Sequence, residues 1–299
     1  QVIGDRHGYA KQWKARNEGK VIGYFCTYVP EEIFYAAGVL PVRILGSHEP
    51  EDITGQHIYG SYCPHCRDCL AQGLEGKYDY LDGISMAQTC MQIRQAFDSW
   101  RKHVPVDYIS DIYIPNYLSS PHTMKYFVTE IEDAKRSVEE WVGRPILDQD
   151  LDRAIEVYNR NRRLTREIYE LQKQNPPPLS GVEAMEMVVS SQVMDKEEHS
   201  HLLEEVLAEI RQQQQRIKPG IRLMTLGSVN DDADFIKTVE TMGANIVIDD
   251  QCTGSRYCWN EVSPGKDRLS AIVQRYIDRP PCPHKDYPER HRVEHMLRL

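Results

Sequence analysis

The sequence has 299 residues, and its 36 Lys and Arg against 45 Asp and Glu give a formal net charge of −9. This excess of acid argues against a nucleic-acid-binding protein, because phosphate binding needs a basic surface. With 40% hydrophobic residues, no apolar run near the roughly 20 residues of a membrane span and no signal peptide, we expect a globular cytoplasmic protein of about two domains, without a membrane partner.

Strands and helices alternate over residues 1–147, which we predict to be a first α/β domain. Pro30 with two acidic residues behind it suits a helix N-terminus, and Gly38 suits the end of that helix. Such alternation is typical of a parallel sheet covered on both faces. The expected strands are 21–25, 41–45, 80–86 and 107–114, and the expected helices are 30–38, 66–76, 122–142 and one that follows Cys90.

A helical connector is predicted for residues 148–218, interrupted at 175–178 by three prolines. A second α/β domain then begins at 219, with strands at 221–226 and 244–248 around a helix at 231–242. Two strands do not make a stable open sheet, and the helical pattern at 290–299 lacks a stop signal. We therefore expect a second domain truncated at its C-terminus.

The most conspicuous local motif is the cysteine run at Cys63, Cys66 and Cys69. Its two-residue gaps match the first three ligands of a bacterial iron–sulfur run, but the fourth position holds Gly73 instead of cysteine. The alternative is that these thiols fill the first turns of a helix as small apolar groups. The incomplete match favours this alternative over local metal binding.

Cys26 and Cys90 form a different kind of pair, because each follows a predicted strand and precedes a predicted helix. The carboxyl ends of parallel strands share one edge of the sheet, where open α/β folds bind their ligands. The two thiols could converge there although they lie far apart in the sequence. From the pattern alone, two unrelated core thiols remain the favoured interpretation.

Three charged or titratable residues follow predicted strands and are further candidates. His48 and Glu49 are either proton donors at the same sheet edge or part of a solvated loop, and the loop is favoured. Arg256 either binds a phosphate or carboxylate or forms an ion pair with Asp249 or Asp250.

Neither the phosphate-binding P-loop pattern nor the glycine pattern of dinucleotide-binding folds occurs in the sequence. Any use of ATP is therefore expected to come from a partner subunit.

Several longer segments together resemble the 2-hydroxyacyl-CoA dehydratase and benzoyl-CoA reductase family, and the resemblance extends over essentially the whole chain. The fuller wording is most similar to the B-type subunits of ATP-dependent benzoyl-CoA reductases. The segments are GYFCTYVPEE at 23–32, AAGVLPVR at 36–43, LGSHEP at 45–50, Cys63-Pro64 with Cys69, LEGKY at 74–78, Thr89-Cys90, RQAF at 94–97, DQCTGSRY at 250–257 and RPPCP at 279–283.

This resemblance implies two Rossmann-like or flavodoxin-like domains and a 4Fe-4S cluster held by three cysteines. Cys26 and Cys90 match the first two ligands, and the third would lie beyond Leu299. Cys66 matches no ligand position of the family. The resemblance thus reverses the preference stated above for the Cys26 and Cys90 pair.

The activity implied is reduction of benzoyl-CoA, or a close analogue, to a cyclohexadiene-carbonyl-CoA. Glu32, His48 and Glu49 are the candidate proton donors, and Arg256 is the candidate substrate-binding residue. The implied partners are an acyl-CoA, a homologous sister subunit, an ATP-hydrolysing activator with a bridging iron–sulfur cluster, and ferredoxin as upstream donor, all in an anaerobic cytoplasm. The alternatives are a 2-hydroxyacyl-CoA dehydratase subunit and an electron-transfer subunit that binds no substrate.

Overall fold

The computed structural model describes residues 2–50, 52–212, 217–285 and 291–299. They form two compact units, the first from Gln1–Ile155 with Ser263–Ile277 and the second from Glu156–Val262 with Asp278–Leu299. Both units contain parallel strands and helices, which confirms the predicted α/β class. The predicted division at 147/148 and 218/219 stays a prediction.

The first unit contains all four strands that were expected in it, although β3 begins three residues later than predicted. Helix α11 was not predicted, and it brings a distant part of the chain into this unit. The elements are α1 Arg6–Asn17, β1 Val21–Tyr24, α2 Glu31–Ala36, β2 Leu40–Arg43, α3 Pro64–Leu74, β3 Gly83–Ala87, α4 Met91–His103, β4 Tyr108–Ile112, α5 Thr123–Val142 and α11 Arg268–Asp278, with short 3-10 helices at Ile3–Asp5 and Asp52–Gln56.

The four strands form one parallel sheet in the order β2-β1-β3-β4. Strands β1 and β3 are adjacent at its centre, with Tyr24 opposite Ser85 near their carboxyl ends. From β1 the chain moves outward to β2 on one side, and from β3 it moves outward to β4 on the other. This is the flavodoxin-like order, whose topological switch point lies between β1 and β3.

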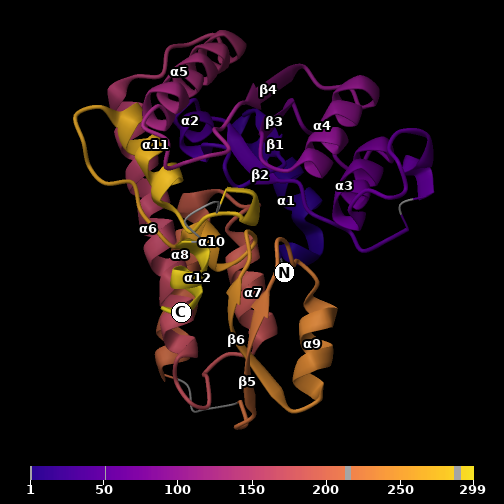
Figure 1. Cartoon of the computed structure of the whole chain (residues 1–299), viewed down its shortest axis with the longest axis vertical. Coiled ribbons are helices and arrows are strands. Elements are labelled where there is room, and N and C mark those ends of the chain that lie inside the picture. The colour runs from indigo at the N-terminus through magenta and orange to yellow at the C-terminus, as the bar shows by residue number, and fades with distance from the viewer. Residues whose placement is uncertain (1, 51, 213–216, 286–290) are drawn as a thin grey trace. The chain divides into compact units, whose positions relative to one another are not determined.

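Helices cover both faces of this sheet, with α3 and α4 on one side and α2 and α5 on the other (Figure 1). The alternation of side chains along β1 explains this, because Val21 and Phe25 join the core under α3 and α4 while Tyr24 faces the opposite way, where Arg43 stacks over its ring. Gly38 takes a φ of +75° directly after α2, and this lets the chain turn back into β2.

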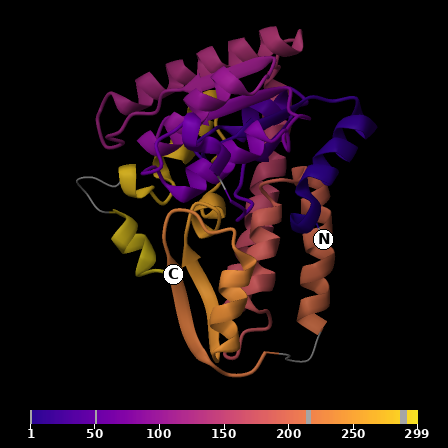
Figure 2. The ribbon, with the colours of Figure 1, turned by 90° about the vertical axis from the view of Figure 1, so that its right-hand side faces the viewer.

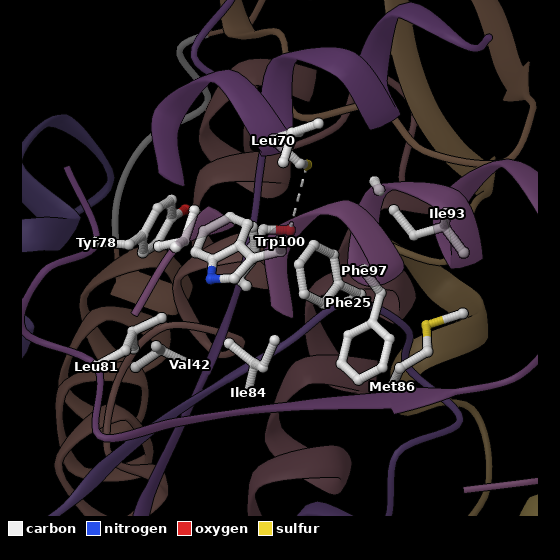
Figure 3. Packing of buried hydrophobic residues seen from close by; sticks show 14 of the residues in the cluster. Phe25, Val42, Leu70, Tyr78, Leu81, Ile84, Met86, Ile93, Phe97 and Trp100 are labelled. Carbon is white, nitrogen blue, oxygen red and sulfur yellow. Dashed lines mark hydrogen bonds between the residues drawn. The ribbon is translucent and has the colours of Figure 1, made fainter. Parts of the chain in front are cut away.

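Trp100 of α4 is the centre of the core on the first of these faces, as Figure 3 shows. Its fully buried ring meets the edge of Phe25 at a centroid distance of 5.3 Å and lies 5.6 Å from the ring of Tyr78. On α3, Gly73 faces the same ring so closely that an added Cβ would lie 2.6 Å from it. Close packing of α3 against α4 therefore depends on the missing side chain at Gly73.

The second unit has a two-stranded parallel sheet in which α9 lies against β6 (Figure 2). The expected helical stretch is confirmed as three helices, with the predicted interruption between α6 and α7. The elements are α6 Asp148–Gln172, which begins in the first unit, then α7 Gly181–Ser190, α8 Lys196–Gln212, β5 Ile221–Leu226, α9 Ala233–Thr241, β6 Ala244–Asp250, α10 Ser255–Cys258, a 3-10 turn at Pro283–Lys285 and α12 His291–Met296.

In the ranges given above, no helix combines the length and the apolar character that crossing a membrane requires.

Candidate functional site

The loops that follow β1 and β3 lie at the switch point of the first sheet. The N–H of Phe25 donates to the carbonyl of Ser85 at 3.1 Å, which continues the pairing of the two strands to their ends. Beyond β1 the N–H of Val29 donates to the carbonyl of Cys26 at 2.9 Å, and beyond β3 the N–H of Gln88 donates to the carbonyl of Ile112 at 2.9 Å. Backbone bonds therefore fix both loops.

Cys26 and Cys90 are carried by these two loops. The Sγ of Cys26 lies 3.3 Å from the Oγ1 of Thr89, the residue directly before Cys90. Cys90 is the N-cap residue of α4, and its carbonyl accepts from the N–H of Arg94 at 3.1 Å. The sheet thus brings the Cys26 segment beside the Cys90 segment, as expected from a shared strand edge.

The donor atoms at this edge suit an iron–sulfur group. Cys26 and Cys90 are free thiols that are only partly buried, and cysteine thiolates are the usual ligands of such clusters. Within the described ranges, no three or more His, Cys, Asp or Glu side chains are arranged to hold a metal ion. The two thiols therefore amount to part of a ligand set, which agrees with a third ligand from elsewhere.

A second thiol pair, Cys63 and Cys66, lies at the start of α3. A hydrogen bond from the thiol of Cys66 lowers the pKa of Cys63 to about 5, although burial acts in the opposite direction. The same hydrogen bond and burial raise the pKa of Cys66, and the charges of Cys69 and Cys90 add to this effect. The N–H of Cys63 also donates to the Oε1 of Gln92, in the first turn of α4.

His48 and Glu49 lie on the loop after β2, and both side chains are exposed. Asp68 of α3 holds this loop, because its Oδ2 accepts from the N–H groups of Ser47 at 2.7 Å and His48 at 3.0 Å. Glu49 forms an exposed ion pair with Lys77 at 3.2 Å. Both residues thus occupy the solvated loop that the sequence favoured, at the carboxyl edge of the sheet.

Glu32 differs from this pair because its side chain is completely buried in α2. The hydroxyl of Tyr276 on α11 donates to its Oε2 at 2.9 Å and lies 3.0 Å from the carbonyl of Val29. The carboxylate is therefore part of the contact between α2 and α11. Its expected role as a proton donor stays a prediction.

Arg256 is buried in the second unit and forms an ion pair with Asp250, at 2.9 Å between Nη1 and Oδ1. Its Nη2 donates to the carbonyls of Gly227 at 3.0 Å and Ser228 at 3.3 Å, and Arg292 contacts the other oxygen of Asp250. The structure therefore shows the ion pair that was the alternative to substrate binding. A substrate would have to displace these contacts, and binding by Arg256 stays a prediction.

Three polar residues near the thiols were not identified from the sequence, namely Asp68, Thr89 and Gln92. Asp68 and Gln92 lie within helices, and their positions show no spacing that marks a site. Thr89 was identified only as part of a longer segment. Its adjacency to Cys90 after a strand was the available signal.

Comparison with known proteins gives a consistent result. The sequence model of the family described as 2-hydroxyglutaryl-CoA dehydratase, D-component, matches residues 26–299. A benzoyl-CoA reductase subunit of Thauera aromatica is 31% identical over 90% of this chain and 71% of its own length. The beta subunit of (R)-phenyllactyl-CoA dehydratase of Clostridium sporogenes is 23% identical over 94% and 75%. The beta subunit of (R)-2-hydroxyglutaryl-CoA dehydratase of Acidaminococcus fermentans is 25% identical over 82% and 65%.

Proposed function

Because the chain belongs to the 2-hydroxyglutaryl-CoA dehydratase D-component family, we propose that it is an iron–sulfur subunit of an ATP-dependent aroyl-CoA reductase. Its substrate would be benzoyl-CoA or a close analogue, and its product a cyclohexadiene-carbonyl-CoA. The observation that carries the proposal is the position of Cys26 beside Thr89 and Cys90 at the switch point of the sheet. The reductase relative is not named as a B-type subunit, so the expected likeness to that type stays a prediction.

We assign Cys26 and Cys90 to hold a 4Fe-4S cluster, together with a ligand from outside this pair. Such a group supplies electrons at potentials down to about −700 mV, which the reduction of an aromatic ring requires. The protein contributes two loops fixed by backbone hydrogen bonds and a sheet end that is buried beneath them. These features hold the thiols in place and limit the access of water from the sheet side.

Proton delivery is assigned by exposure and by position at the sheet edge. His48 is exposed there and its backbone is held by Asp68, so its imidazole is the preferred proton donor. Glu49 is the second candidate, in competition with its ion pair to Lys77. Glu32 is better placed to support α2 through Tyr276 than to meet a substrate.

The relatives are named as subunits, which supports a homologous sister subunit as the first partner of this chain. An ATP-hydrolysing activator with a bridging cluster, supplied by ferredoxin, completes the proposal. The sequence carries neither the P-loop pattern nor the glycine pattern of dinucleotide-binding folds, which agrees with ATP hydrolysis on another subunit.

Cysteine substitutions test the cluster site. We expect Cys26→Ser and Cys90→Ser to abolish cluster binding, whereas Cys66→Ser retains it. The measurement is the iron and acid-labile sulfide content of the protein after anaerobic purification, with circular dichroism to verify folding. Full iron content in the first two variants would contradict the assignment.

A 2-hydroxyacyl-CoA dehydratase is the second candidate function, because other relatives are dehydratase subunits. A reductase consumes electrons in proportion to its product, whereas a dehydratase uses its electron catalytically. Counting reduced donor consumed per product, in the assembled complex, separates the two. An electron-transfer role without substrate is excluded if an acyl-CoA binds within contact of the site on this chain.

A further inference from the structure

The start of α3 carries two cysteines separated by two residues, with Pro64 at the first helical position. Cys63 is the N-cap residue, and its carbonyl accepts from the N–H of Cys66 at 3.0 Å and of Arg67 at 3.1 Å. Residues three apart lie on the same side of a helix, so this first turn places the two side chains together. The spacing is that of Cys-X-X-Cys redox motifs.

The two sulfur atoms are in contact and differ in exposure. The thiol of Cys66 hydrogen-bonds to the sulfur of Cys63, and Cys66 is only 4% exposed whereas Cys63 is partly open to solvent. This hydrogen bond favours the thiolate at Cys63, in agreement with its lowered pKa. A partly exposed thiolate backed by a buried thiol is the arrangement that thiol–disulfide exchange requires.

The third cysteine of the run does not belong to this pair. The sulfur of Cys69 lies 3.6 Å from the Nε2 of His65 and 3.9 Å from the carbonyl oxygen of Ile44, so it is directed toward other partners. Cys69 is fully buried. Two of the three cysteines of the run therefore form a functional pair, and the third belongs to the core.

We propose that Cys63 and Cys66 form a redox-active dithiol that exchanges with a low-molecular-weight disulfide. The Cys63 thiolate attacks one sulfur of the external disulfide, forms a mixed disulfide and releases one thiolate. Cys66 then attacks the Cys63 sulfur, closes the intramolecular bridge and releases the second thiolate, while its own proton passes to solvent. The external disulfide gains the two electrons that the pair loses, so the exchange is balanced.

Oxidised glutathione is a suitable probe, and mass spectrometry of the full-length chain is the readout. The protein is equilibrated anaerobically in glutathione buffers of stepped potential, quenched in acid, alkylated and digested with trypsin. Trypsin cleaves after Arg43 and Arg67, so Cys63 and Cys66 lie together in peptide 44–67 and Cys69 lies in 68–77. We expect peptide 44–67 to lose two hydrogen atoms and to escape alkylation as the potential rises.

Three variants sharpen the test. Cys66→Ser should trap glutathione on Cys63, Cys63→Ser should abolish the internal bridge completely, and Cys69→Ser is the control that should keep it. Alkylation of both cysteines at every potential, a bridge that links peptide 44–67 to 68–77, or glutathione that stays on Cys63 in the unsubstituted chain would each overturn the proposal. Because the readout uses neither iron content nor activity, its failure is distinguishable from failure of the proposed function.

Discussion

His199 of α8 is a buried histidine whose hydrogen bonds suit the neutral ring. Its Nδ1 lies 2.8 Å from the Nδ2 of Asn161, which donates, and its Nε2 donates to the carbonyl of Met187 at 3.0 Å. Burial lowers the pKa of the imidazole to about 4, and the charge of Lys196 adds to this. The folded state therefore resists protonation of His199 in a range where the unfolded chain accepts a proton.

The pH dependence of stability follows from this difference. Because the folded pKa lies below the unfolded value of 6.5, His199 stabilises the fold above pH 6.5, and this contribution of about 3 kcal/mol is lost as the pH falls toward 4. We expect His199→Gln to destabilise the protein most at pH 7 and progressively less below pH 6.5, as measured by urea unfolding. His201→Gln, an exposed position on the same helix, is the control. A constant destabilisation by His199→Gln from pH 7 to pH 4 would contradict the argument.

Single residues were the least predictable part of the site. The convergence of Cys26 with the Cys90 segment followed from the position of each cysteine after a strand, since the order of parallel strands fixes where their ends lie. Burial of Glu32 did not follow, because its partner Tyr276 is distant in sequence and belongs to the unpredicted helix α11. Contacts of this kind leave no local pattern.

Among the elements, α3 and α4 depend on a close approach at Gly73. Alanine favours helices over glycine by about 1 kcal/mol, so propensity alone would make Gly73→Ala stabilising. The added Cβ would instead lie 2.6 Å from the ring of Trp100, and overpacking of a core costs about 1–3 kcal/mol. The rigid ring cannot move away easily, so we expect net destabilisation.

Urea unfolding of Gly73→Ala measures this effect, with Gly55→Ala as the matched control. No atom lies within 4 Å of a Cβ built at Gly55, outside its own neighbours, so that substitution should change the free energy of unfolding little. The packing argument fails if Gly73→Ala is as stable as the unsubstituted chain.

Most elements were predictable because their signals are local. Apolar runs, Pro30 and Gly38 marked β1, α2 and their neighbours correctly. Strand β3 begins at Gly83 rather than at residue 80, because the apolar residues before it belong to a turn in which the N–H of Leu81 donates to the carbonyl of Tyr78. Hydrophobicity alone does not separate such a turn from a strand.

At the scale of the whole molecule, the two sheets differ in how well they are enclosed. Strand β1 has a strand on each side and is buried throughout, whereas β5 pairs only with β6 among the described residues. On β5 the side chains of Ile221 and Leu226 are 71% and 61% exposed. Local opening should therefore cost less free energy in the second sheet.

Hydrogen exchange of the isolated chain measures this difference. We expect the amides of β1 and β3 to exchange at least about tenfold more slowly than those of β5. Peptides from α5, a long helix packed on the first sheet, provide an internal reference. Equal exchange in β1 and β5 would show that exposure of the second sheet does not lower its protection.

The division of the connections at the centre of the first sheet has a consequence for diversification within the family. The segment after β1 leads to one edge of the sheet and the segment after β3 leads to the other, so either can vary in length without altering the register of any strand. Relatives named for phenyllactyl-CoA and 2-hydroxyglutaryl-CoA differ in the size and charge of the acyl group. A constant frame with two independently adjustable rims is a simple route to such a repertoire.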